Sequence, residues 1–242
     1  VPRGKCVGIV GESGCGKSMT ARSVMRLLKY PGKIVSGSIT PEGKELTALT
    51  EAEMSNVRGE EISMIFQDPL TSLNPLFQIG TQITESLKIH MGLSKEEAKK
   101  QAVLLLEKAG MPNPEEGLKK YPHTLSGGMR QRAMIAMALA CNPKLLIADE
   151  PTTALDVTIQ AQIMKLLKEL QQQMGMAMIL ITHDMGIVAH MADRVLVMYA
   201  GQIIEKAPVK ELFSNPAHPY TRALLNTIPD INDAGKKLVS IP

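Results

Sequence analysis

Residues Gly11 to Ser18 read Gly-Glu-Ser-Gly-Cys-Gly-Lys-Ser, a spacing of glycine, lysine and serine that suits a chain of phosphates. The glycines let successive backbone N–H groups turn inward around an anion, and a helix that begins at the loop adds its positive end. Lys17 is predicted to reach the terminal phosphates, and Ser18 to hold Mg²⁺.

The flanking residues provide the strand–loop–helix context that such a loop needs. The apolar run Cys6 to Val10 predicts a buried strand, and Met19 to Leu28 predicts a helix. This context argues against the alternative, a glycine-rich turn without a ligand. The candidate phosphate-binding residues are Gly11, Glu12, Ser13, Gly14, Cys15, Gly16, Lys17, Ser18 and Met19.

Two carboxylates, Asp149 and Glu150, end the apolar run Leu145 to Ala148, which predicts another strand. In a parallel sheet, ligands bind at the carboxyl ends of the strands. Asp149 is therefore expected to face the Mg²⁺ held by Ser18, and Glu150 to orient and polarise the water that attacks the γ-phosphate. The alternative is two solvated acids in a turn, and the phosphate loop argues against it.

Two more polar residues follow predicted strands. His183 follows Ile179 to Thr182 and is expected at the same sheet edge, near the γ-phosphate or the attacking water. Gln67 follows the predicted strand Glu61 to Phe66, where it could touch the metal or the water. Alone, a histidine or glutamine in such a place is most often a satisfied polar residue. The other histidines, His90, His123, His190 and His218, are interpreted as structural.

Ser126, Gly127 and Gly128 begin a predicted helix that runs to Cys141. Ser126 is a good N-cap, and the glycines expose backbone N–H groups at the positive helix end. One phosphate chain does not need two helix ends from distant parts of one chain, so this second anion site could complete a site on another subunit. A plain capped helix is an equally fair interpretation. Asp156 is expected to cap the next helix and could also face a partner subunit.

The elements that position these residues alternate between strands and helices. Asp156 to Met174 has the spacing of an amphipathic helix, and further strands are predicted at Met178 to Ile181 and Arg194 to Tyr199. This alternation predicts a doubly wound parallel sheet. A short hairpin is predicted at Ile34 to Leu46, with Pro41-Glu42-Gly43 as its turn.

The stretch from Asp68 to Asn142 carries helix signals and almost no strand signals. Four apolar residues at helical spacing precede Gly92, and Ser94 with Glu97 forms a capping box for a helix to Ala109. The hypothesis is an α/β core at 1–67 and 143–207, an inserted helical subdomain at 68–142, and a truncated, peripheral C-terminal extension at 208–242.

Composition excludes several classes of protein. The chain has 242 residues, 44% of them hydrophobic, and a net charge of +3 with basic residues scattered among acidic ones, which does not indicate a nucleic-acid partner. No apolar stretch approaches the ~18 residues that span a membrane, and no signal peptide is recognisable. The three cysteines lie far apart, which suits a reducing compartment and indicates neither a zinc site nor a disulfide framework.

These motifs together resemble the ATP-binding subunits of ABC transporters over nearly the whole chain. The matches are a Walker A loop at Gly11–Ser18, a Q-loop at Gln67, a signature at Leu125–Gln131, a Walker B strand at Leu145–Glu150, a D-loop at Ala154–Asp156 and a switch histidine at His183.

The resemblance implies a P-loop NTPase (RecA-like) core with an inserted helical subdomain, and MgATP hydrolysis. It implies Glu150, His183 and Gln67 as catalytic residues, and Ser18, Gln67 and Asp149 as metal-binding ones. Two ATP molecules would lie between head-to-tail subunits, identical or paralogous, each held also by the partner's signature. Such a dimer drives transmembrane permease subunits from the cytoplasmic face of the cell membrane, with Gln67 and the helical lobe as the coupling surface.

Two segments, Phe66–Pro75 and Asn215–Leu225, resemble segments of dipeptide and oligopeptide importers. In such importers a substrate-binding protein delivers the peptide, so it is implied as an indirect partner. Nickel importers share both segments, so metal import is the alternative. The family's upstream aromatic residue that stacks on adenine is expected to be missing, and neither Tyr30 nor Tyr199 is assigned that role. The cysteines that hold an iron–sulfur cluster in the peptide branch are absent, so no cluster is expected.

Two other classes of function are alternatives for a chain with a phosphate loop. A soluble ABC ATPase acting on ribosomes or DNA usually carries two ATPase units or a long coiled-coil insertion, and this chain has neither. A non-hydrolysing nucleotide-binding module would be favoured by a missing glutamate or histidine, and both Glu150 and His183 are present.

Overall fold

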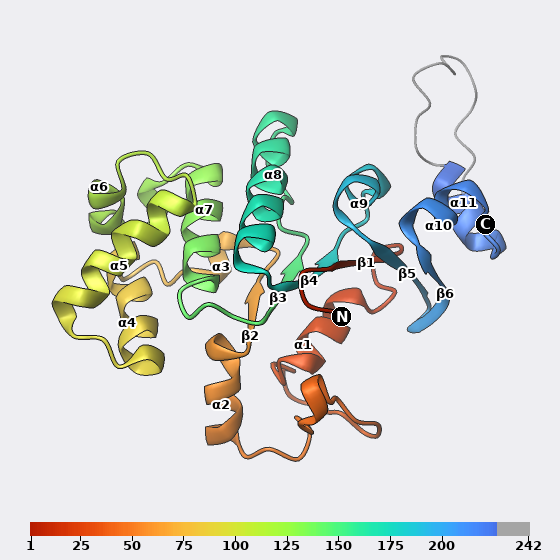
Figure 1. The fold of residues 1–242 in the computed structure, drawn as a ribbon, viewed down its shortest axis with the longest axis horizontal. Helices are drawn as coiled ribbons and strands as arrows, with labels where there is room; N and C mark the ends of the chain where they lie inside the picture. Colours follow the sequence, from red (N-terminus) through yellow and green to blue (C-terminus); the bar gives the residue numbers. More distant parts are fainter. Residues whose placement is uncertain (227–242) are drawn as a thin grey trace.

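A six-stranded sheet in the order β2-β3-β4-β1-β5-β6 lies at the centre of the molecule (Figure 1). The computed structural model describes residues 1–226. The strands are β1 (Cys6–Val10), β2 (Ile62–Ile65), β3 (Leu145–Asp149), β4 (Ala177–Ile181), β5 (Arg194–Tyr199) and β6 (Gln202–Pro208). All neighbouring strands pair in parallel except β5 and β6, which form an antiparallel hairpin. The predicted parallel sheet is confirmed.

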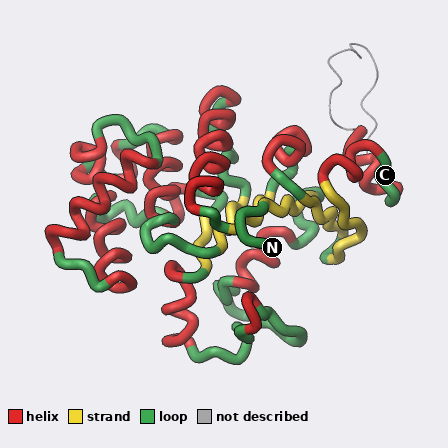
Figure 2. Tube along the Cα trace, viewed as in Figure 1, coloured by secondary structure: helices red, strands yellow, loops and turns green. Residues whose placement is uncertain are grey.

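Helices surround this sheet and also form a separate cluster beside it (Figures 1 and 2). In chain order they are α1 (Lys17–Val24), α2 (Glu51–Glu60), α3 (Pro69–Ser72), α4 (Ile79–Met91), α5 (Lys95–Lys108), α6 (Pro114–Lys119), α7 (Gly127–Ala138), α8 (Val157–Met174), α9 (Met185–Met191), α10 (Val209–Ser214) and α11 (Pro219–Asn226). Short 3₁₀ turns lie at Pro41–Gly43 and Pro122–Thr124.

The core has one hydrophobic cluster on each face of the sheet. Along β3, Leu146 and Ala148 join the cluster that contains Leu167 of α8, whereas Ile147 joins the one that contains Met54 of α2. This alternation follows from the two-residue period of a strand. Figure 1 shows α8 and α9 on one side of the sheet and α1 and α2 on the other. Because both faces are covered, polar residues can collect only where the strands end.

The cluster beside the sheet consists of α3 to α7, and no strand interrupts it (Figure 2). The predicted capping box is present: Glu97 N–H donates to Ser94 Oγ at 3.3 Å, and Ser94 N–H donates to Glu97 Oε2 at 3.0 Å. Gly92, with φ 63°, ends α4 in the left-handed conformation that glycine adopts without strain. The predicted helices on either side of Gly92 are therefore confirmed, whereas the helix predicted to run to Cys141 ends at Ala138.

The predicted hairpin at Ile34 to Leu46 is wrong. Leu46 N–H donates to Ile39 O at 2.8 Å, but the Glu45 side chain accepts from Ile39 N–H at 3.1 Å and so replaces a strand partner. The expected turn is the 3₁₀ turn Pro41–Gly43. In addition, α1 ends at Val24 rather than Leu28, because Arg26 is left-handed with φ 51°. A helix cannot continue through that conformation.

Candidate nucleotide site

The phosphate loop connects β1 to α1, as predicted. Gly11 has φ 153°, and a Cβ atom there would lie 2.2 Å from the carbonyl oxygen of Met198. Gly14 and Gly16 have φ 83° and 106°, and Gly16 is the N-cap of α1. Side chains are strongly disfavoured at such angles. Glycine is therefore required at Gly11 for close packing and at the other two positions for backbone conformation.

Lys17 lies inside this loop with only 5% of its surface exposed. Its Nζ donates to the backbone oxygens of Gly11 at 2.7 Å and Glu12 at 2.8 Å, and lies 3.8 Å from Cys15 Sγ. A buried ammonium needs such partners. The loop thus holds one positive charge among the backbone groups that would surround a phosphate.

Ser18 and Asp149 meet at the ends of α1 and β3, although they are far apart in the sequence. The Ser18 hydroxyl donates to Asp149 Oδ1 at 2.8 Å. Burial raises the pKa of Asp149, as does the charge of Glu150, while the hydrogen bond from Ser18 opposes the rise. The predicted approach of these two side chains is present.

The oxygens of Ser18 and Asp149 fit Mg²⁺, which prefers hard oxygen ligands. Within residues 1–226, no group of three or more His, Cys, Asp or Glu side chains could hold a metal ion. Mg²⁺ is commonly held by one or two protein oxygens together with substrate phosphates and water, so a sparse donor set of this kind suits it.

Glu150 brings together the polar residues that follow three strands. Its Oε2 accepts from Gln67 Nε2 and from the Thr153 hydroxyl, both at 3.0 Å, and its Oε1 lies 3.4 Å from His183 Nδ1. The Glu150 backbone has φ 45°, a strained conformation of the kind that clusters at functional sites. Gln67, Glu150 and His183 thus form one hydrogen-bonded group, as their positions after strands predict.

Glu150 and His183 border an open pocket of about 300 Å³. The side chain of Glu150 is 12% exposed, whereas that of His183 is 65% exposed. Thr153 and Leu155 also line the pocket. The carboxylate is therefore screened from bulk water on most sides but remains reachable from the pocket.

The Ser126 segment packs against residues around the start of α8. Ser126 Oγ accepts from Met129 N–H at 3.3 Å and caps α7. A Cβ on Gly127 would lie 3.2 Å from Leu155, and one on Gly128 would lie 3.0 Å from Ile159. Within residues 1–226 no hydrogen bond joins this segment to the phosphate loop.

Asp156 performs the expected capping, since its Oδ1 accepts from Ile159 N–H at 2.9 Å at the start of α8. Asp156 and the Ser126 segment therefore both lie near Ile159, and Leu155, which Gly127 approaches, also lines the pocket beside Glu150.

One contact of the site was not predicted. The hydroxyl of Tyr220, on α11, accepts from Glu12 N–H in the phosphate loop at 3.0 Å. Tyr220 is 7% exposed, so the expectation of a peripheral C-terminal extension is wrong at this residue. The available signal was an aromatic side chain in a segment otherwise rich in proline and asparagine. The rest of the predicted extension, 227–242, lies outside the described residues.

Comparisons with known proteins agree with this geometry. Residues 1–153 match the family model described as ABC transporter. The chain belongs to the ABC transporter family. Residues 204–242 match a second model, described as oligopeptide/dipeptide transporter, C-terminal region. The family that the sequence motifs resemble is therefore confirmed.

Two relatives of this ABC chain align with almost its whole length. It is 58% identical to the oligopeptide transport ATP-binding protein OppD of Bacillus subtilis over 99% of this chain and 68% of that protein. It is 52% identical to the dipeptide transport ATP-binding protein DppD of Escherichia coli over 100% of this chain and 74% of that protein.

Among solved structures, the dimeric post-hydrolysis ATP-binding cassette MJ0796 with ADP and Pi matches with a TM-score of 0.77 and 29% identity, over 86% of this chain and 87% of that one. The P-loop NTPase fold and the ATP-hydrolysing class are thus confirmed. Within residues 1–226, no helix combines the length and apolar character needed to cross a bilayer.

Proposed function

We propose that this chain is the ATP-hydrolysing motor subunit of an ABC importer of dipeptides or oligopeptides. The match of residues 204–242 to the oligopeptide/dipeptide transporter model carries the choice of cargo. The names of OppD and DppD support the same choice.

In this proposal, residues Gly11 to Met19 surround the phosphates of ATP, which are bound by backbone N–H groups of this loop other than that of Glu12 and by the ammonium of Lys17. Ser18, Asp149 and Gln67 would hold Mg²⁺, which neutralises the charge on the phosphates when bound. The bond between Ser18 and Asp149 at 2.8 Å supports this assignment, because it already brings two of the oxygens together.

Glu150 accepts the proton of the attacking water. Its Oε2 is fixed by Gln67 and Thr153, so its Oε1, beside His183, remains to face the water. Orientation of this kind is how a general base contributes to hydrolysis. Gln67 and His183 therefore position the carboxylate and the water.

A second copy of this chain or a paralogue completes each site in trans. Ser126, Gly127 and Gly128 would contact the phosphates held by the partner, and Asp156 would face the partner. Within the described chain this segment has no hydrogen bond to its own phosphate loop, which supports a role across an interface. The dimeric state named for MJ0796 supports the same arrangement.

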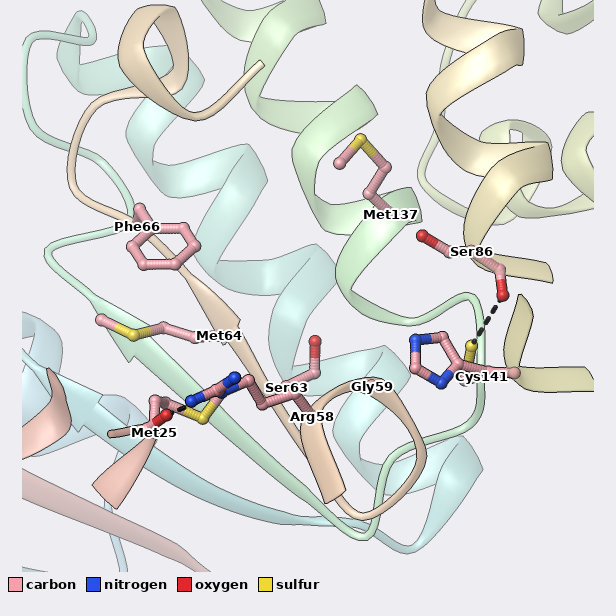
Figure 3. A pocket seen from close by; sticks show the side chains of 10 residues that line it. Met25, Arg58, Gly59, Ser63, Met64, Phe66, Ser86, Met137 and Cys141 are labelled. Carbon is pink, nitrogen blue, oxygen red and sulfur yellow. Dashed lines mark hydrogen bonds between the residues drawn. The ribbon is translucent and has the colours of Figure 1, made fainter. Parts of the chain in front are cut away.

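The transmembrane permease subunits would dock between the sheet and the helical cluster, on the cytoplasmic face of the cell membrane. A pocket of about 220 Å³ lies there. Figure 3 shows Met25 and Arg58 on one side of it and Ser86, Met137 and Cys141 on the other. Arg58 Nε donates to Met25 O at 2.8 Å and fixes that wall.

The helical cluster also has three exposed apolar residues that a permease subunit would cover: Leu76, Phe77 and Ile89 are 79%, 51% and 68% exposed. A substrate-binding protein would supply the cargo from the other side of the membrane. In this scheme the core is 1–67 and 143–207, the coupling subdomain 68–142 and the importer-type extension 208–242.

Mixing two inactive variants tests the trans arrangement. Lys17→Ala disables the phosphate loop and Ser126→Arg disables the signature, so each homodimer should lack ATPase activity. A mixed dimer contains one intact composite site, and MgATP hydrolysis should reappear on mixing and rise more steeply than linearly with protein concentration. Activity in the Ser126→Arg variant alone would contradict the trans role. For the cargo, the chain should restore dipeptide uptake in cells that lack their own importer ATPases.

A further inference from the structure

The phosphate loop is held from outside by residues of the C-terminal region. Glu12 N–H is the backbone donor of the second residue of the loop, and its acceptor is the Tyr220 hydroxyl at 3.0 Å. Backbone donors elsewhere in such a loop are directed at phosphate. At Glu12 a protein side chain takes that place.

Tyr220 is placed by two features of its surroundings. Its ring packs on the ring of Tyr199, with centroids 4.7 Å apart at 52°. The segment before α11 is fixed to β6, because Glu205 accepts from Ala217 N–H at 2.8 Å and from His218 N–H at 3.0 Å. The hydroxyl therefore cannot move from Glu12 without a change in these contacts.

The β5–β6 hairpin, which carries Tyr199 and Glu205, fixes the phosphate loop at a second point. Gly201 N–H, in the turn between β5 and β6, donates to Cys15 O at 2.9 Å. The close approach of Gly11 to Met198 O, on β5, adds steric contact. Met198, Gly201 and Tyr220 thus all contact the phosphate loop, and Tyr220 is the most C-terminal of the three.

We propose that Tyr220 is a positioning residue for nucleotide binding, which fixes the first turn of the phosphate loop and makes ATP affinity depend on the C-terminal region. The proposal rests on the nucleotide-binding role of Gly11 to Ser18. Burial raises the pKa of Tyr220, while the hydrogen bond from the Glu12 N–H opposes the rise, so the net shift keeps the hydroxyl neutral near physiological pH and it does not repel phosphate.

Tyr220→Phe removes the hydroxyl and keeps the ring against Tyr199. Loss of one hydrogen bond that orders the loop should weaken MgADP binding about two- to tenfold, measured by calorimetry on the whole chain. The KM for ATP should rise by the same factor, with kcat at saturation unchanged. Tyr30→Phe is the matched control, because Tyr30 is 98% exposed, and it should leave MgADP affinity unchanged.

A merely structural role would lower the melting temperature of Tyr220→Phe without changing KM, and that result would overturn the proposal. Hydrogen exchange of the Glu12 amide, measured by NMR without nucleotide, tests the contact in the unmodified chain even where the variant fails to fold. We expect slow exchange there, and exchange at the rate of an exposed loop amide would refute the contact. Failure of the unmodified chain to bind MgADP would instead contradict the proposed function, and the Glu12 exchange rate separates the two outcomes.

Discussion

Replacing Glu150 with glutamine removes the proposed base while keeping its hydrogen bonds. An amide oxygen in the place of Oε2 can accept from Gln67 and Thr153, as the carboxylate does at 3.0 Å. The amide nitrogen then faces His183 Nδ1, which lies 3.4 Å from Oε1. Glu150→Gln should therefore fold normally and bind MgATP with an affinity within about threefold of the unmodified chain, because Gln67 and Thr153 keep their acceptor and the exposed His183 ring can take the tautomer whose Nδ1 accepts from the amide.

The expected change is in turnover. A general base contributes about a hundred- to ten-thousand-fold to a rate, which corresponds to about 2.7 to 5.5 kcal/mol of activation free energy. Phosphate release should be measured at saturating MgATP, and binding separately. Glu107→Gln makes the same chemical change on the exposed surface of α5 and should leave both unchanged. A kcat for Glu150→Gln within tenfold of the unmodified chain would refute the assignment of Glu150 as the base.

Three further variants test other parts of the structure. The raised pKa of Asp149 means that the folded chain holds its proton to higher pH than the unfolded chain, so this group lowers stability as pH rises through that interval. Asp149→Asn should therefore have a higher melting temperature than the unmodified chain at about pH 7, and this difference should disappear at about pH 4. The variant should also lose turnover. Ser94→Ala removes the cap that accepts from Glu97 N–H and should cost about 1 kcal/mol in urea unfolding, with ATP affinity unchanged; a cost below about 0.3 kcal/mol would contradict the capping. Gly11→Ala places a Cβ 2.2 Å from Met198 O and should abolish MgADP binding, so retained affinity would show that the loop can shift.

The helices and strands that carry strong local signals were predictable. Gly92 marks the end of α4, and the Ser94 capping box marks the start of α5. Both were predictable because local backbone conformation alone determines those helix ends. The Ile34 to Leu46 hairpin failed because Glu45 competes for a backbone donor, which pattern matching does not consider. Helix α2 was not predicted, although Thr50 and Glu53 form a capping box like that of α5.

The candidate site divides in the same way. The phosphate loop and the strand-end residues Gln67, Glu150 and His183 were predictable, because parallel strands bring their carboxyl ends to one edge. The contact of Tyr220 with Glu12 was not, because it depends on how α11 folds back over the β5–β6 hairpin. No local rule connects positions 208 residues apart.

The site is assembled from residues that are distant along the chain. The contacts of Ser18 with Asp149, Gln67 with Glu150 and Glu12 with Tyr220 span 131, 83 and 208 positions. Closing such long loops costs conformational entropy before any contact offsets it, so these contacts should form late in folding. A nucleotide that binds only the finished site stabilises the folded chain by mass action, by about 2.7 kcal/mol at a hundred times its dissociation constant. ATP would then be both the substrate of this chain and the ligand that stabilises the long-range contacts which form last in folding.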